Sequence, residues 1–226
     1  MRSPCSRSCS PDSPLLRRSW NRSWSGLAAE RPPVVFGQEQ VLGQEVFEAL
    51  CERYSESTRK YHTLQHLGEC LGYFEQVRDL AQHPAEVETA LWFHDAIYEL
   101  AKHDNEAASA SWAESELARA GVETQSMDRI KSLIMATCHS SAPIEPDQCL
   151  LVDIDLSILG ASDNRFQEYE RQIREEYSFV PETIFIQKRR EILKSFLDRP
   201  RIYSTHYFFD RLESLARRDL TQAVRA

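Results

Sequence analysis

Glycine, closely paired cysteines and long apolar runs are all scarce or absent in this 226-residue chain. Its seven glycines are about 3% of the residues where roughly 7% is ordinary, which disfavours glycine-rich nucleotide-binding loops and many-stranded sheets. The six cysteines include no Cys-x-x-Cys pair, so a zinc finger is excluded and we interpret them as reduced thiols. No stretch approaches the 18 or so consecutive apolar residues of a membrane span, and no apolar segment follows the start as in a secretory signal. We therefore expect a soluble, cytoplasmic protein with no membrane partner.

Charge is distributed unevenly along the chain. The 27 Lys and Arg residues against 35 Asp and Glu residues give a formal net charge of −8, so we expect no nucleic-acid partner. Residues 1–31 nevertheless contain six arginines and only two acidic residues, together with many serines. We predict a disordered extension over residues 1–14, which is either an organellar transit peptide or the product of a start codon placed too early.

A helical period dominates the rest of the chain. Apolar residues recur at intervals of three and four, which is typical of amphipathic helices. Pro84 suits the first turn of a helix, and Gly121 suits the residue after the end of one. With no internal repeat and no long linker, the pattern predicts one all-α domain over residues 15–226, whose oligomeric state is left open. After a first helix from about residue 15, the predicted helices cover residues 41–54, 67–77, 84–97, 105–120, 130–137, 150–159, 162–177, 181–197 and 205–223.

The most informative pair of residues is His94-Asp95, which lies in the apolar sequence Ala-Leu-Trp-Phe-His-Asp-Ala-Ile-Tyr of the predicted helix 84–97. An ionised carboxylate buried there is costly unless it meets a cation or hydrogen-bond donors, and a metal ion would satisfy both side chains. His103-Asp104 is a contrasting pair because it lies in a polar stretch, where solvent satisfies both groups. We interpret Asp104 as a helix N-cap and His94-Asp95 as part of a metal site, with a buried hydrogen-bonded pair as the alternative.

Further candidate ligands lie before and after this pair. His62 and His66 precede it at the start of a predicted helix, and Asp153 and Asp155 follow it in the apolar run 150–160. Two imidazoles and two carboxylates form a set of N and O ligands suited to Mn, Fe, Co, Ni or Zn, and such a set leaves positions open for water and substrate. Spacing alone does not choose between Asp153 and Asp155.

Five motifs occur in order along the chain. They are Arg-x-Tyr-His-x-x-x-His (59–66), His-Asp-x-x-Tyr (94–98), Asn-Glu-x-x-Ser-Ala (105–110), Ala-Thr-x-His (136–139) and Asp-x-Asp-Leu-Ser-x-Leu-Gly (153–160). This order resembles the HD superfamily of metal-dependent phosphohydrolases, and is most similar to a bacterial-type group of predicted metal-dependent HD phosphohydrolases. The resemblance covers roughly residues 16–222. It implies an HD-type helical bundle that hydrolyses phosphate esters.

The resemblance also implies a role for each candidate ligand. Asp155 is preferred to Asp153 as a ligand because an Asp-Leu-x-x-Leu-Gly frame fits the last motif of the superfamily better, which leaves Asp153 to hold a ligand or orient a water. His139 matches a second-metal ligand of some members, with a satisfied core histidine as the alternative. The implied ligands of the first divalent metal are His66, His94, Asp95 and Asp155.

The reaction implied is attack of a metal-activated water on a small phosphate ester, such as a nucleotide or a related metabolite. Asp155 or Asp153 would orient that water, and Glu106 is a candidate acid, base or ribose contact. An acidic protein also needs local positive charge to hold an anionic substrate. The candidate substrate contacts are Arg59, Lys60, His62, Asn105, Arg174 and Arg189.

Three positions depart from the family pattern and leave the substrate open. Cys138 stands where the family usually has a lysine, and the residues near 188–189 and 218–220 also differ. A lost lysine would weaken or redirect activity if it normally contacts the substrate phosphate. Two other functions stay open: a di-iron oxygenase of HD type, in which His62 and His139 would help to hold two irons, and a catalytically silent metal-binding module.

Overall fold

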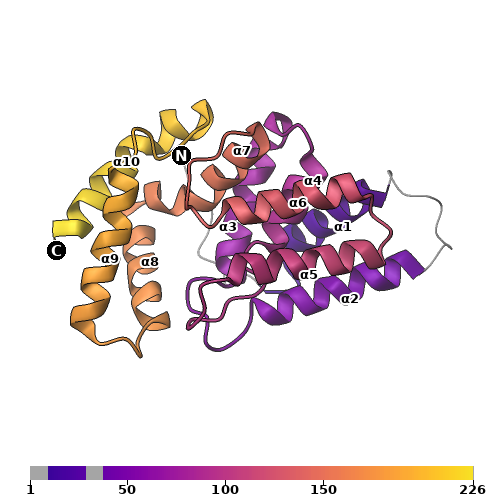
Figure 1. The fold of residues 1–226 in the computed structure, drawn as a ribbon, viewed down its shortest axis with the longest axis horizontal. Coiled ribbons are helices and arrows are strands. Elements are labelled where there is room, and N and C mark those ends of the chain that lie inside the picture. The colour runs from indigo at the N-terminus through magenta and orange to yellow at the C-terminus, as the bar shows by residue number, and fades with distance from the viewer. Residues whose placement is uncertain (1–9, 29–37, 226) are drawn as a thin grey trace.

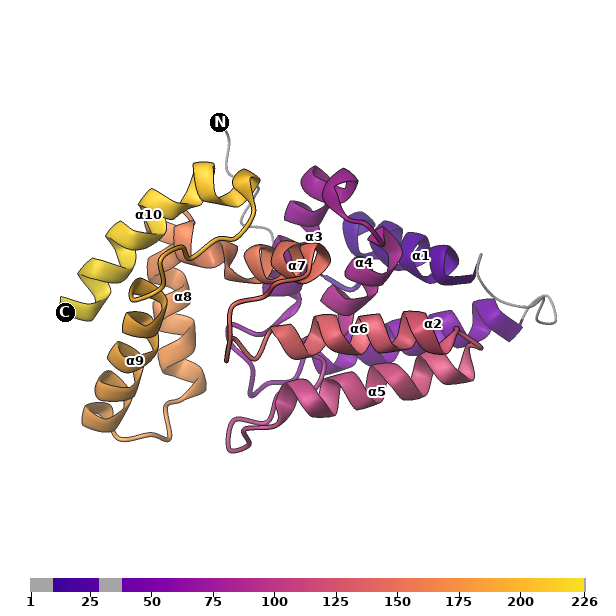
Figure 2. The ribbon, with the colours of Figure 1, turned by 45° about the horizontal axis from the view of Figure 1, so that its top comes forward.

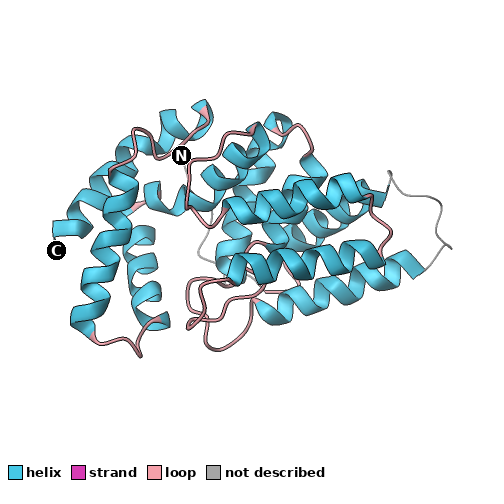
Figure 3. Cartoon of the chain, viewed as in Figure 1, coloured by secondary structure: helices cyan, strands magenta, loops and turns pink. Residues whose placement is uncertain are grey.

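A computed structural model describes residues 10–28 and 38–225. These residues form ten α-helices and two short 3-10 helices, with no strand among them, which confirms the predicted all-α fold (Figure 3). The predicted extension over residues 1–14 lies mostly outside the described residues. The α-helices are α1 (Pro14–Ala28), α2 (Gln38–Arg53), α3 (Leu64–Val77), α4 (Pro84–Phe93), α5 (Asn105–Arg119), α6 (Thr124–Ala136), α7 (Pro146–Asp155), α8 (Asp163–Glu176), α9 (Glu182–Leu197) and α10 (His206–Arg225); η1 (Arg78–Leu80) and η2 (Leu156–Gly160) are the 3-10 helices.

Local sequence explains several helix ends. The Thr63 hydroxyl accepts a hydrogen bond from the Gln65 backbone N–H and caps α3. Pro84 occupies the first turn of α4, as predicted. Gly121 has φ of +74°, a left-handed conformation that glycine adopts without steric cost, so the chain leaves α5 there. Asp104 lies at the N-cap of α5, but its side chain makes no capping hydrogen bond.

Two predicted helices end earlier than the apolar period suggested. Helix α4 ends at Phe93, so His94 and Asp95 lie just beyond it and not inside a helix that reaches Ile97. Beyond Phe93 the Ala96 N–H bonds to the Phe93 carbonyl, and the Ile97 N–H donates to the Ser109 hydroxyl of α5 in place of a helical acceptor. The predicted helix 150–159 likewise divides after Asp155, where α7 gives way to η2. Both breaks place candidate ligands at helix ends.

An aromatic core fixes α1 against α2 and α4. The Trp20 ring lies 5.0 Å from Trp24, 5.4 Å from Trp92 and 6.3 Å from Phe47, centroid to centroid, and all four side chains are buried. The Trp92 indole N–H donates to the Ser19 hydroxyl at 3.0 Å. Buried aromatic contacts of this kind combine a large apolar area with defined geometry. The C-terminal end of α4, where His94 and Asp95 follow, is therefore held rigidly.

The helices form two groups. In both ribbon views, α1 to α7 lie together and α8, α9 and α10 lie beside them (Figures 1 and 2). The η2 segment joins the groups, because it packs against α7, α8 and α10. Gly160 makes one of these contacts possible, since a Cβ there would lie 2.7 Å from the Leu212 Cβ of α10. None of the described helices combines the length and apolar character that crossing a bilayer requires.

Candidate metal centre

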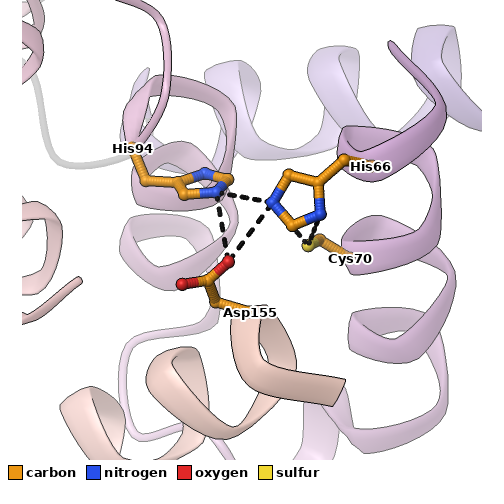
Figure 4. A group of neighbouring side chains, drawn as sticks. All are labelled: His66, Cys70, His94 and Asp155. Carbon is orange, nitrogen blue, oxygen red and sulfur yellow. Dashed lines mark hydrogen bonds and ion pairs between the residues drawn. The ribbon is translucent and has the colours of Figure 1, made fainter. Parts of the chain in front are cut away.

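Four predicted ligands converge at the junction of α3, α4 and α7. His66 Nε2 and His94 Nε2 lie 3.1 Å apart, and Asp95 Oδ2 lies 3.5 Å from His66 Nε2 and 3.1 Å from His94 Nε2. Asp155 Oδ1 lies 3.2 Å and 3.6 Å from the same two nitrogens. Figure 4 shows the two rings and the Asp155 carboxylate turned toward one another. Ligands separated by up to 89 residues therefore meet around one point.

These separations fit a metal ion. Bonds of about 2.0–2.2 Å give ligand-to-ligand edges of roughly 3.3–3.6 Å in a tetrahedron and roughly 2.8–3.1 Å in an octahedron. The five separations between 3.1 and 3.6 Å fall in this range. Two nitrogens and two carboxylate oxygens match the donor preferences of Mn, Fe, Co, Ni and Zn. The spacing of the His66, His94 and Asp155 atoms is thus that of ligands to one divalent ion, and Asp95 lies beside both imidazoles.

Neighbouring groups fix the orientation of both imidazoles. His94 Nδ1 lies 2.8 Å from the Leu91 carbonyl oxygen, to which it donates, so in the neutral ring the lone pair of Nε2 faces the other ligands. His66 Nδ1 lies 3.0 Å from the Tyr61 hydroxyl. Metal-binding histidines commonly use their second nitrogen in this way. The rings are therefore held in place before any ion binds.

The same four side chains are strongly coupled electrostatically. Burial lowers the pKa of His94, but the charge of Asp95 and the hydrogen bonds of both aspartates outweigh it and hold that pKa well above its ordinary value. Burial raises the pKa of Asp155, but hydrogen bonds from His139, His66 and His94 hold it well below its ordinary range. In the metal-free protein, the carboxylates thus favour protons on the imidazoles. A divalent cation would displace those protons.

Asp153 does not join the cluster, which corrects its predicted catalytic role. Its Oδ1 accepts from the Ser204 N–H at 2.8 Å, and its Oδ2 accepts from the Thr205 N–H and hydroxyl at 2.7 and 2.6 Å. Thr205 immediately precedes α10, so this buried carboxylate anchors the start of that helix. The two aspartates are two residues apart on α7, which turns their side chains about 200° from each other. Asp155 therefore faces the ligands, as preferred, and Asp153 faces α10.

Arg59 is not available to a substrate phosphate, which corrects a second prediction. Its guanidinium is buried and donates to the carbonyl oxygens of His62, Asp95 and Ala96 at 3.2, 2.6 and 2.9 Å. A further hydrogen bond reaches Glu56. Because two of these acceptors belong to the segment after α4, Arg59 holds the backbone that carries the Asp95 ligand.

Asn105 and Arg174 also serve the backbone rather than a substrate. The Asn105 amide accepts from the Glu99 N–H at 2.9 Å and donates to the Glu99 carbonyl at 3.1 Å. The Arg174 guanidinium donates to the carbonyls of Tyr177 and Val180 and lies over the Phe185 ring. These contacts close the loop before α5 and the turn after α8. We therefore remove both residues from the substrate contacts.

His139 and Glu106 lie at the pocket side of the centre. His139 Nε2 is 3.0 Å from Asp155 Oδ2, the oxygen that faces away from His66 and His94. Its Nδ1 is buried without a hydrogen-bond partner among the described residues, and its φ is +53°. Burial, and then the nearby Glu106 side chain, raise the pKa of the Cys138 thiol. His139 is thus placed to support Asp155 or to contribute to a second site.

His62 is held by a residue that the sequence did not indicate. Its Nδ1 lies 2.8 Å from Glu176 Oε2, while Glu176 Oε1 accepts from the backbone N–H groups of Lys60, Tyr61 and His62 at 2.7 to 3.0 Å. The His62 ring stacks on Tyr98 at 3.8 Å. No motif marks Glu176, because its role arises from packing between α8 and a segment 114 residues earlier.

Cys70 is a further neighbour of the cluster that the sequence analysis omitted. Its Sγ lies 3.7 Å from both ring nitrogens of His66, four residues earlier on the same face of α3. With His66, His94 and Asp155 it forms a group whose ligand atoms lie within 4.8 Å of one another. The i, i+4 spacing from His66 was the available signal.

A pocket of about 650 Å³ opens on the carboxylate side of the centre. Asp95, Asp155 and His139 line its inner end, and α8, α9 and the turn between them form the facing wall. The predicted substrate contact Arg189 also lines it, although its guanidinium is paired with Glu170 of α8. A volume of this size suits a small organic ligand.

Neither family models, nor curated proteins, nor solved structures yield a match to this chain. The comparisons therefore assign no class and no relative. What the structure itself shows is an all-α protein with a buried group of histidine, cysteine and aspartate side chains able to hold a metal ion.

Proposed function

We propose that the protein is a metal-dependent phosphohydrolase of the HD type that acts on a small phosphate ester. The observation that carries this proposal is the convergence of His66, His94, Asp95 and Asp155, with separations of 3.1 to 3.6 Å, at the inner end of a pocket. The five ordered motifs support the same class. The ion would be divalent, with Mn, Co, Ni, Zn and Fe as candidates.

When bound, the ion supplies Lewis acidity, which lowers the pKa of a water and draws charge from phosphoryl oxygens. The chain holds the carboxylates for this chemistry in place, because Arg59 fixes the backbone of Asp95 and His139 contacts the outer oxygen of Asp155. Asp155 is also close enough to the pocket to orient an attacking water.

Lys188 and Arg189 provide positive charge in the pocket wall for an anionic substrate. Lys188 is paired with Glu191 and Arg189 with Glu170, so the net charge of this wall is small. We therefore expect the two cations to orient a bound substrate by direct contact and not to attract it over a long distance. The Nδ1 atom of His62 is bound to Glu176, so Nε2 is the nitrogen that would contact a substrate oxygen. Glu106 remains a candidate acid or base at the same pocket.

The test combines elemental analysis with an activity screen. Protein purified without chelator is assayed for bound metal and for phosphate release from nucleotides, sugar phosphates and simple esters with added Mn²⁺, Co²⁺ or Ni²⁺. We expect one bound ion per chain and turnover that is lost in His94→Ala and Asp95→Ala. Turnover that is equal in these variants, or absent from the wild type with every metal, would reject the hydrolase.

The di-iron oxygenase is the alternative with a specific observation in its favour. His139 lies 3.0 Å from the second oxygen of Asp155, so these two residues would hold a second ion there. His62, the other expected ligand, is instead engaged by Glu176. Two irons per chain with oxygen consumption would favour the oxygenase, whereas bound metal without any turnover would favour the silent metal-binding module.

A further inference from the structure

The two ends of the pocket differ in chemistry. Its inner end, at the metal centre, is lined by the polar groups Asp95, Asp155 and His139. Its α8–α9 wall is instead mainly aromatic and aliphatic, with Tyr169, Ile173, Tyr177, Phe179, Phe185 and Ile192 among its residues. A ligand whose phosphate occupies the inner end would therefore place the rest of its body against an apolar wall.

Two large apolar side chains of this wall remain exposed to solvent, and a bound ligand would cover them. Phe179 is 60% exposed and Ile192 is 49% exposed, although both line the pocket. Large apolar side chains that remain accessible in a concave site are typical of ligand contacts. Because the apolar area removed from water drives such binding, covering these two side chains would strengthen the hold on an apolar body.

Most polar groups of the same wall are already engaged. The Tyr177 hydroxyl of this wall lies 3.2 Å from the Tyr98 hydroxyl of the segment after α4, and the two hydrogen-bond each other. Arg189 is paired with Glu170, and Lys188 is paired with Glu191. A ligand rich in hydroxyl groups, such as a sugar phosphate, would lose water without gaining matched partners at this wall, and unpaired polar groups are costly to bury.

We propose that the substrate is a phosphate ester of an apolar alcohol, with an alkyl or aryl body seated on the α8–α9 wall. This inference rests on the proposed function and narrows it to one substrate class. Lys188 and Arg189 stand on the same wall with their charges paired by Glu191 and Glu170, so this wall fits the apolar body and the metal centre fits the anionic head.

The experiment follows a chain-length series in two readouts. Ethyl, butyl, hexyl and octyl phosphate, kept below the concentration at which they form micelles, are compared with glucose 6-phosphate in the Mn²⁺-loaded protein. The first readout is kcat/KM for phosphate release, and the second is Kd from calorimetry. Fully burying one methylene group strengthens binding by about fourfold. We therefore expect both kcat/KM and the binding affinity to be at least about tenfold higher for octyl phosphate than for butyl phosphate.

A matched pair of variants on α9 locates the effect. Ile192→Ser removes a pocket residue, and Ile186→Ser removes a residue that is 39% exposed on another face and lines a different surface hollow. We expect Ile192→Ser to reduce the preference for octyl over ethyl phosphate by about tenfold, and Ile186→Ser to leave it unchanged. Phe179→Ser, in the turn before α9, serves as a second pocket variant.

The outcomes separate this proposal from the hydrolase proposal. Turnover that does not change with chain length, or that favours glucose 6-phosphate, overturns the apolar substrate and keeps the hydrolase. Affinity that rises with chain length in the wild type but not in Ile192→Ser, without any turnover, keeps the apolar ligand and rejects the hydrolase. A flat Kd together with no turnover rejects both.

Discussion

Truncating Asp155 and Asp153 separately gives the sharpest test of how the two aspartates divide their roles. Asp155→Ala removes one of two carboxylate ligands, and loss even of a residue that only supports a ligand commonly costs 10- to 100-fold in metal affinity. We therefore expect Asp155→Ala to weaken Mn²⁺ binding by at least about 100-fold. Asp153→Ala should leave Mn²⁺ binding unchanged, because all three of its hydrogen bonds go to Ser204 and Thr205.

The stability of the Asp153→Ala variant depends on the hydrogen-bond donors of Ser204 and Thr205, which lose their acceptor. Two backbone N–H groups and one hydroxyl lose their acceptor, at about 1–3 kcal/mol for each buried group left unpaired. Burial raises the pKa of Asp153 to about 6, which shows that its charged form carries a desolvation cost, and removing the carboxylate returns part of the loss. We expect a net decrease of about 1–3 kcal/mol in the free energy of unfolding.

The assay pairs urea unfolding of the metal-free proteins with calorimetric titration by Mn²⁺. Both variants are compared with the wild type in the same buffer, so a folding defect is distinguished from a binding defect. Metal affinity lost in Asp153→Ala but retained in Asp155→Ala would refute the assignment of the two aspartates.

Two further predictions concern pH and the Arg59 anchor. The pKa values of His66 and His94 are held well above 6.5 in the metal-free protein, where burial is outweighed by nearby side chains, the two aspartates included. The stability from these raised pKa values is present below pH 6.5 and is lost as pH rises through the folded-state values. A metal ion must displace the proton that one Nε2 donates to the other across 3.1 Å, so the affinity for Mn²⁺ should rise by about tenfold per pH unit, and calorimetry that shows no pH dependence would contradict this. Arg59→Ala leaves three carbonyl acceptors without their donor, so it should lower the free energy of unfolding, measured by urea titration, by about 2–4 kcal/mol. The control Lys60→Ala, at the exposed neighbouring residue, should change it by less than about 0.5 kcal/mol. Equal effects of the two substitutions would contradict the role of Arg59 as an anchor.

The helices were predictable because their apolar period is a local pattern, whereas the ligand set was predicted from the buried His94-Asp95 pair together with the resemblance to the HD superfamily. The 3.6-residue period marks helices directly, and the costs of burying charge single out His94-Asp95 from His103-Asp104. The end of α4 at Phe93 was not predictable in this way, because the Ile97 N–H beyond it donates to Ser109 of another helix.

The arginines show the limit of reading charge from sequence. Arg59, Arg174 and Arg189 were equally plausible phosphate contacts by residue type, but only Arg189 lines the pocket. Arg59 and Arg174 donate to backbone carbonyls instead, in loops whose geometry is set by tertiary packing. Glu176 was overlooked for the same reason, since its four acceptor contacts join segments that are distant in sequence.

Anomalous diffraction from a crystal of the Co²⁺-loaded protein tests the metal centre most directly. We predict one strong peak bonded, at about 2.0–2.2 Å, to His66 Nε2, His94 Nε2, Asp95 Oδ2 and Asp155 Oδ1. Peaks elsewhere, with these four atoms still in contact only with one another, would contradict the metal centre and the function built on it.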